Sequence, residues 1–209
     1  MSEEVIQNSP EWHELKCGWI GASRIGDMLA TTKNGWAASH KNYFNELLAQ
    51  RLTGRRTSRY VYSLNSRLEM EPEARSAYAF YTSNDVVEVG FIPHPRIERA
   101  GASPDGLVGD DGGLEIKCCD VGAHLAMIET GVIDSDYIYQ CQFGMACSER
   151  QWWDFVAYHP DLPEELKFWT KRIERDDHAI SRIEAAVREF DAEIENKIAA
   201  IRSNGIRAA

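Results

Sequence analysis

The chain has 209 residues, of which 44% are hydrophobic, and its formal net charge is −10. This length is enough for one full hydrophobic core, so we expect a single domain over residues 1–209. No stretch approaches the roughly 18 apolar residues of a membrane span, and the N-terminus has neither a basic start nor an apolar run. The composition therefore excludes a membrane protein and predicts a soluble intracellular one.

The five cysteines are odd in number and include no CxxC pair. This spacing argues against a zinc site, an iron–sulfur cluster and a disulfide framework. We expect the cysteines to be reduced thiols of the core.

Basic residues are concentrated in one part of the chain. Residues 15–67 hold nine Lys or Arg against two acidic residues, whereas residues 68–209 carry a charge of −13. Arg51, Arg55 and Arg59 lie in the basic segment near tyrosines, a combination suited to phosphate contacts and base stacking. Charge runs are more often plain solvated surface, so both interpretations of the three arginines stay open.

The first part of the chain is predicted to be helical. Ser9 is a favourable N-cap because a proline and an acidic residue follow it. Ser23 is a second N-cap candidate, ahead of a short apolar helix. Apolar residues at helical spacing between positions 43 and 52 predict a helix that ends at Gly54, and a third long helix is predicted over residues 68–80.

Strands are predicted to begin near residue 86 and to lead into a hairpin. Leu114 and Ile116 alternate with Glu115 and Lys117, so the period of a strand puts the apolar side chains on one face and the charged ones on the other. The preceding run of glycines and aspartates tolerates positive φ and predicts a tight turn. This turn brings Asp105 alongside Glu115.

Helices and strands also alternate in the second half of the chain. Two shorter helices are predicted around residues 124–129 and 137–147. Aromatic and β-branched residues over 152–158 predict a central strand, and residues 166–170 suggest one more. Apolar residues at steps of three and four predict a long amphipathic helix from 177 to about 203, ended by Asn204-Gly205. The order of elements predicts an α/β sandwich.

The hairpin has the residues of a cation site. Mg²⁺ prefers carboxylate, carbonyl and water oxygens, which Asp105, Glu115 and the Ile116 carbonyl can supply. Lys117 lies beside them as a base or an electrostatic stabiliser. A match to so short a pattern is also typical of an ordinary hairpin with a solvated acidic turn.

Pro104-Asp105 followed by Glu115-Ile116-Lys117 resembles the PD-(D/E)xK nuclease motif. Over a longer span the chain resembles the phage lambda exonuclease family of alkaline exonucleases, also called YqaJ-like viral recombinases. Five blocks in the same order carry this resemblance: WHELKCGWIGASRIGDMLA, YFNELLAQRLTG, EPEARSAY, SPDGLVGDDGGLEIKC and YIYQCQ. The resemblance implies a restriction-endonuclease-like mixed sheet flanked by helices, with a long C-terminal helix.

The resemblance also implies which residues form the catalytic site. Asp105, Glu115 and Lys117 match the metal-binding and catalytic positions of the family. The metal-binding glutamate of the preceding helix falls on Glu71, with Glu69 as the second choice. A solvated helical glutamate is the alternative for either residue.

Four further positions are implied in the same way. An active-site glutamine falls on Gln140, with Gln142 as the less favoured alternative. A pocket for the 5′-phosphate of a DNA end falls on Lys16, Ser23 and Ser103. Lys16 departs from the expected arginine and lacks its planar fork, so this pocket is expected to grip phosphate less tightly. The two serines have alternatives as a helix cap and a turn residue.

By resemblance the chain is a Mg²⁺-dependent exonuclease that digests one strand of linear double-stranded DNA from 5′ to 3′. It leaves 3′ single-stranded tails for single-strand annealing recombination. The resemblance implies two metal ions per active site, with Mn²⁺ able to substitute, a ring-shaped homotrimer and a single-strand annealing protein as partner. It also implies a phage or prophage origin and the cytoplasm of a bacterial host. An endonuclease of the same fold and a non-catalytic DNA-end-binding scaffold are the alternatives.

Overall fold

The computed structural model describes residue 7, residues 9–56 and residues 65–207, so Arg59 lies outside the described part. The helical elements are α1 (Pro10–Leu15), η1 (Ala22–Arg24), α2 (Ile25–Leu29), α3 (Ala38–Thr53), α4 (Asn65–Thr82), α5 (Val121–Thr130), α6 (Ser135–Ser148), η2 (Glu164–Leu166) and α7 (Asp177–Arg207). The strands are β1 (Ile20–Gly21), β2 (Thr31–Thr32), β3 (Gly35–Trp36), β4 (Val86–Val87), β5 (Ile92–Pro93), β6 (Ala100–Ala102), β7 (Gly106–Val108), β8 (Gly112–Lys117), β9 (Trp152–Tyr158) and β10 (Phe168–Glu174).

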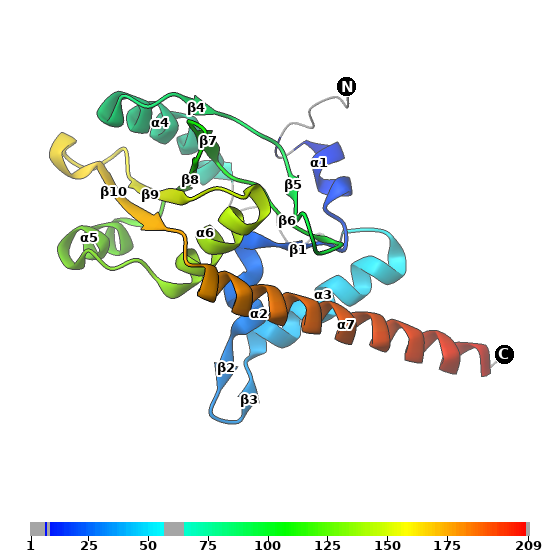
Figure 1. The fold of residues 1–209 in the computed structure, drawn as a ribbon. Helices are drawn as coiled ribbons and strands as arrows, with labels where there is room; N and C mark the ends of the chain where they lie inside the picture. The colour runs from blue at the N-terminus through cyan, green and yellow to red at the C-terminus, as the bar shows by residue number, and fades with distance from the viewer. Residues whose placement is uncertain (1–6, 8, 57–64, 208–209) are drawn as a thin grey trace, which may run out of the picture.

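A five-stranded mixed sheet with the order β10-β9-β8-β7-β4 lies at the centre. Strands β8 and β9 are parallel, whereas the other neighbours are antiparallel. The predicted mixed sheet flanked by helices, with a long C-terminal helix, is confirmed (Figure 1).

The period of two along β9 divides the core between the two faces of this sheet. Trp153, Phe155 and Ala157 belong to one hydrophobic cluster, together with residues of α2, α3, α6 and α7. Val156 and Tyr158 belong to a second cluster, with residues of α4, β7 and β8. Helix α4 therefore covers one face and α6 the other, which explains why both faces of β9 are apolar.

A smaller sheet with the order β1-β6-β5 lies beside the central one. Strand β1 pairs with β6 in parallel, and the Ile20 N–H donates to the Arg99 carbonyl over 2.7 Å. Strand β6 runs directly into Ser103 and Asp105. This pairing therefore brings the N-terminal helices next to the segment that carries the predicted catalytic aspartate.

Local capping explains some helix ends and corrects one prediction. The Ser9 hydroxyl accepts a hydrogen bond from the Trp12 N–H over 3.1 Å, as predicted for the start of α1. Helix α3 ends at Gly54, whose φ of 65° is the left-handed conformation that favours glycine. The predicted cap at Ser23 is wrong, because this residue lies inside η1 and α2 begins after Arg24 without a side-chain cap.

Two element ends also differ from the predictions. Leu166 lies in η2, so the last strand begins at Phe168. Helix α7 does not end at Asn204-Gly205 but continues to Arg207. Gly205 is not among the glycines with positive φ, and a glycine ends a helix only when it adopts that conformation.

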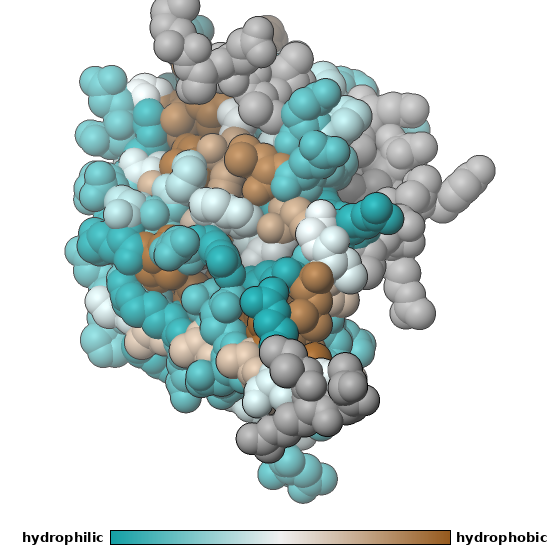
Figure 2. All heavy atoms as spheres, turned by 90° about the vertical axis from the view of Figure 1, so that its right-hand side faces the viewer, coloured by the Kyte–Doolittle hydropathy of each residue, from teal (hydrophilic) through white to brown (hydrophobic). Residues whose placement is uncertain are grey.

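Helix α7 lies across the body of the molecule, and its C-terminal part extends beyond it (Figure 1). The apolar stripe of the helix consists of buried residues, namely Ile180, Ile183, Val187, Phe190, Ile194 and Ile198. Phe190 also contacts the ring of Tyr43 in α3 with centroids 5.7 Å apart. Figure 2 shows the face of the molecule on the side where α7 ends. This face is mostly hydrophilic, with small hydrophobic areas between polar side chains. Within the described residues, no helix is both long and apolar enough to cross a membrane.

We predict that Ile194→Ala lowers the free energy of unfolding by about 2 to 5 kcal/mol, because truncation of a fully buried side chain leaves a cavity. Glu193→Ala on the exposed face of the same helix is the control and is expected to change it by less than about 0.5 kcal/mol. Urea unfolding of the two variants checks this. Equal values for both would mean that α7 does not dock through this stripe.

Candidate active site

Nine of the predicted site residues line one cavity of about 400 Å³. They come from segments spread between residues 16 and 140, including α4 and α6, which cover opposite faces of the sheet. These residues are Lys16, Ser23, Glu71, Ser103, Asp105, Glu115, Ile116, Lys117 and Gln140. The fold therefore gathers in one place the residues that the motifs indicated separately.

The β7–β8 hairpin positions Asp105 against Glu115. Gly106 pairs with Leu114 at the open end of the hairpin, and the Asp105 N–H donates to the Leu114 carbonyl over 3.1 Å. The Ile116 N–H donates in turn to Asp105 Oδ2 over 2.6 Å. Backbone hydrogen bonds thus hold the Asp105 carboxylate beside the strand that carries Glu115 and Lys117.

Glu115, Lys117 and Gln140 form a compact hydrogen-bonded group. Glu115 Oε1 accepts from Lys117 Nζ over 2.5 Å and from Gln140 Nε2 over 2.7 Å. Lys117 Nζ also donates to Gln140 Oε1 over 3.2 Å. The Tyr137 ring lies beneath the ammonium, with its centroid 5.1 Å from Nζ. Helix α6 therefore supplies two side chains that orient the charged pair of β8.

Burial and repulsion raise the pKa of the Asp105 carboxyl well above its usual range. The repulsion comes from Glu115 and Glu71, and it outweighs the opposing effects of Lys117 and the Ile116 N–H. Burial by itself lowers the pKa of Lys117, but the carboxylates of Glu115 and Asp105 reverse this effect and raise it. The carboxylates of Glu115 and Asp105 thus favour the protonated form of Lys117. The same carboxylates favour binding of a further cation in the cavity.

Glu71 faces the cavity from α4 and is held by an ion pair. Its Oε1 accepts from the Arg75 guanidinium over 2.7 Å. Burial raises the pKa of the Glu71 carboxyl, Arg75 opposes this, and Glu115 and Glu88 add to it. Glu71 therefore belongs to the same electrostatic cluster as the two carboxylates of the hairpin.

The donor set fits a hard divalent cation. Glu71, Asp105 and Glu115 present carboxylate oxygens to the cavity, and Mg²⁺ needs only one or two protein carboxylates because it keeps several waters. Among the side chains that the structure describes, those of residue 7 and residues 9–56 and 70–205, no group of three or more His, Cys, Asp or Glu is arranged as a metal site. Burial and repulsion from Glu115 and Glu71 raise the pKa of Asp105, and a cation here would offset both effects.

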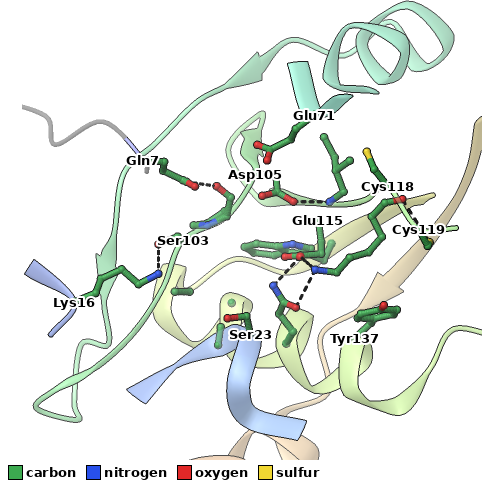
Figure 3. A pocket seen from close by; sticks show the side chains of 18 of the residues that line it. Gln7, Lys16, Ser23, Glu71, Ser103, Asp105, Glu115, Cys118, Cys119 and Tyr137 are labelled. Carbon is green, nitrogen blue, oxygen red and sulfur yellow. Dashed lines mark hydrogen bonds and ion pairs between the residues drawn. The ribbon is translucent and has the colours of Figure 1, made fainter. Parts of the chain in front are cut away.

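Lys16, Ser103 and Ser23 lie at the other end of the cavity (Figure 3). Lys16 Nζ donates to Ser103 Oγ over 3.3 Å and lies 3.6 Å from the centroid of the Trp12 ring. Burial, and next the positive charge of Arg56, lowers the pKa of Lys16 to about 7. The three predicted phosphate-binding residues therefore do come together, with a lysine that loses its charge near neutral pH.

The predicted DNA-binding arginines do not join this cavity. Arg51 has a side chain that is only 4% exposed and forms ion pairs with Asp191 over 2.6 Å and Glu195 over 3.0 Å. Its guanidinium fastens α3 to α7, so a phosphate would have to compete with both carboxylates. Arg55 is exposed at the end of α3, outside the residues that line the cavity.

The structure also bears on the residues that were given as alternatives, Gln142 to Gln140 and Glu69 to Glu71. Gln142 is buried away from the site, where its amide donates to the Glu174 carbonyl over 2.8 Å and accepts from the Asp176 N–H over 2.9 Å. Gln140, by contrast, contacts both charged residues of β8. The side chain of Glu69, the alternative to Glu71, lies outside the described part of the chain.

Arg75 and Gln7 are among the residues at the site that were not predicted. Arg75 contacts Glu71 one turn away, and this i,i+4 spacing was a signal that could have revealed it. Gln7 lines the cavity and its amide donates to the carbonyls of Val89 and Pro104, both over 2.7 Å. Its contacts span more than 80 positions, so no local pattern pointed to it.

Comparisons with known proteins agree on one family. The profile of the YqaJ-like viral recombinase domain matches residues 11–151. The crystal structure of LHK-Exo in complex with dAMP is 44% identical, covers 96% of this chain and 100% of its own, and superposes with a TM-score of 0.90. The alkaline exonuclease LHK-Exo from Laribacter hongkongensis has the same identity and coverage and a TM-score of 0.89.

A more distant structure shares the fold alone. A phage-related exonuclease from Haemophilus somnus 129PT is 14% identical, covers 88% of this chain and 96% of its own, and has a TM-score of 0.70. No curated protein sequence matches the chain.

We predict that Asp105→Asn stabilises the cation-free protein at pH 8. A carboxyl whose pKa is raised by folding contributes stability below its unfolded pKa of about 3.9, and this contribution is lost as the pH rises through the folded value. Asparagine keeps an acceptor for the Ile116 N–H but removes the charge. The melting temperature in EDTA is expected to rise by about 2 to 4 °C, which corresponds to about 1 kcal/mol in a protein of this size.

The gain is expected to shrink towards pH 4, and Asp110→Asn in the exposed hairpin turn is the control that should show no gain. An Asp105→Asn protein that melts below the wild type at pH 8 would contradict the electrostatic account of this cavity.

Proposed function

This chain belongs to the YqaJ-like viral recombinase domain family, and we propose that it is a Mg²⁺-dependent 5′ to 3′ exonuclease that digests one strand of linear double-stranded DNA. The observation that carries the proposal is the convergence of Glu71, Asp105, Glu115 and Lys117 in one cavity. The 44% identity to an alkaline exonuclease over nearly the whole chain supports a nuclease role. The products in this proposal are mononucleotides and a 3′ single-stranded tail.

In this proposal the carboxylates hold the metal ions. Asp105, Glu115 and the Ile116 carbonyl would hold one Mg²⁺, and Glu71 would complete a second site. Bound Mg²⁺ supplies charge stabilisation at the scissile phosphate and makes water a better nucleophile at neutral pH. Mn²⁺ is expected to substitute because it takes the same oxygen ligands.

Lys117 acts in this proposal as a fixed positive charge. Its pKa is raised by Glu115 and Asp105, so it offers an ammonium to a phosphate oxygen and does not take a proton from water. Gln140 orients this ammonium by contacting both members of the pair. Hydrolysis adds water to the phosphorus and breaks its bond to the 3′ oxygen, releasing a 5′-mononucleotide. The related LHK-Exo was crystallised with dAMP, which is a molecule of this kind.

Lys16, Ser23 and Ser103 receive the terminal 5′-phosphate in this proposal. They line the same cavity as the carboxylates, so a phosphate held there would place the next phosphodiester near the metal ions. The lysine supplies charge and the hydroxyls supply hydrogen bonds. This arrangement would define the direction of digestion.

The wider assembly is proposed on the family relationship alone. We infer that the chain acts as one nuclease domain within a homotrimeric ring threaded by DNA, with the exposed Arg55 and also Arg59 along the DNA track. A single-strand annealing protein would coat the 3′ tail. The inferred setting is the cytoplasm of a bacterial host, with a phage or prophage as the source of the gene.

The test is a digestion of linear duplexes labelled at the 5′ or the 3′ end, beside a covalently closed circle, with Mg²⁺ present. We expect early release of the 5′ label as a mononucleotide and no cleavage of the circle. Cleavage of the circle would indicate an endonuclease of the same fold, and binding without cleavage a non-catalytic scaffold. Lys117→Met should lower the rate by about 10² or more, whereas Lys171→Met, far from the cavity, should not.

We predict that preference for a 5′-phosphate over a 5′-hydroxyl end falls between pH 7 and pH 9. The pKa of Lys16 is lowered to about 7, so its charge is lost as the pH rises through this range. Lys16→Arg keeps its charge and should retain the preference at pH 9, whereas Lys16→Ala should lack it throughout. Initial rates on matched duplexes measure this. A preference that is independent of pH in the wild type would argue against Lys16 as the phosphate ligand.

A further inference from the structure

Arg75 connects three parts of the chain at the edge of the cavity. Its Nε donates to the Asp105 carbonyl over 2.9 Å, and one terminal nitrogen donates to Glu71 Oε1 over 2.7 Å. The other terminal nitrogen pairs with Glu88 Oε1 over 3.0 Å. The side chain is only 14% exposed, so these contacts form largely away from solvent. A single guanidinium therefore joins α4, the turn before β7 and the segment after β4.

Arg75 contacts the side chain of one proposed metal-binding residue, Glu71, and the backbone of the other, Asp105. At Glu71 the guanidinium binds one carboxylate oxygen, which fixes the rotation of the side chain. At Asp105 it binds the backbone carbonyl and leaves the carboxylate to the Ile116 N–H. Arg75 thus limits how far α4 can move from the hairpin, and with it how far Glu71 can move from Asp105.

Arg75 also contributes to the charge balance of the cavity. Glu71, Asp105 and Glu115 bring three negative charges together, and Lys117 contacts Glu115 but not Glu71 among the described hydrogen bonds and ion pairs. Arg75 neutralises the cluster on the α4 side, where Glu88 adds a fourth carboxylate.

We propose that Arg75 is a positioning residue that sets the separation and orientation of Glu71 and Asp105 and thereby the affinity of the site for divalent cations. The inference rests on the proposed function, because it assigns both carboxylates to metal binding. Arg75 itself touches neither substrate nor metal in this account.

Lysine cannot replace Arg75 in this role. The three partners lie in different directions around one planar group, and Nε and both terminal nitrogens are used. An ammonium keeps the charge but not the planar fork that reaches three acceptors at once. Arg75→Lys therefore separates positioning from charge, since a purely electrostatic role would survive this substitution.

The experiment measures binding of Mn²⁺ alone to the DNA-free protein by calorimetry, together with kcat and KM on a linear duplex. For Arg75→Lys we expect binding of Mn²⁺ to weaken by about 10- to 100-fold, as for other residues that orient metal ligands, and kcat to fall. KM for the duplex should change less than about twofold. Arg172→Lys is the matched control, because Arg172 forms a bidentate pair with Asp154 on β9 and does not line the cavity.

Wild-type Mn²⁺ affinity in Arg75→Lys, or an equal loss in Arg172→Lys, would overturn the inference. Should Arg75→Lys fail to fold, Arg75→Gln serves as a second variant, and it must show the same weakened binding with a melting curve that confirms folding. A wild-type protein that neither binds Mn²⁺ nor cleaves linear DNA would refute the proposed function itself. An active wild type with an unaffected Arg75→Lys refutes only the role of Arg75.

Discussion

Three carboxylates held close together and partly buried at one cavity are the constraint on which the site depends. Burying a carboxylate is costly unless it is paired, and burying several together adds repulsion. Each carboxylate is stabilised by a donor: the Ile116 N–H at Asp105, the Lys117 ammonium at Glu115 and the Arg75 guanidinium at Glu71. The repulsion that remains is what makes the cavity receptive to cations.

The central sheet makes this arrangement rigid. Strand β8 carries Glu115 and Lys117 towards α6, while the alternate side chains Leu114 and Ile116 pack towards α4. Because β8 pairs with β7 on one side and β9 on the other, its register cannot slip without moving Leu114 and Ile116 out of the core that α4 covers. The same packing that stabilises the fold thus fixes the charged pair, and Gln140 reaches it from α6.

Local patterns were sufficient to predict most of the fold and the placing of Asp105 beside Glu115 and Lys117, whereas the other candidate site residues came from the family resemblance. The alternation along β8, the glycine-rich turn and the stripe of α7 were visible because period and turn chemistry are local properties. Ser23 and Gly205 were misjudged because a residue type permits a cap without enforcing its backbone conformation. The pairing of Arg51 with α7 and the contacts of Gln7 depend on tertiary packing across many positions, which no short window of sequence contains.

The hairpin turn over residues 109–111 lies at the far end of β7 and β8 from Asp105 and Glu115. Arg150 closes its base by donating to the carbonyls of Val108 and Gly112 over 3.3 and 2.7 Å. We therefore expect residues inserted at the exposed Asp110 to leave the pairing below this closure in place. The number of residues between Asp105 and Glu115 is therefore set by the length of the turn and not by the geometry of the two carboxylates. A sequence motif for such sites should allow this number to vary. For the same reason, this loop is the natural place for a peptide tag or a fluorophore in an otherwise undisturbed enzyme.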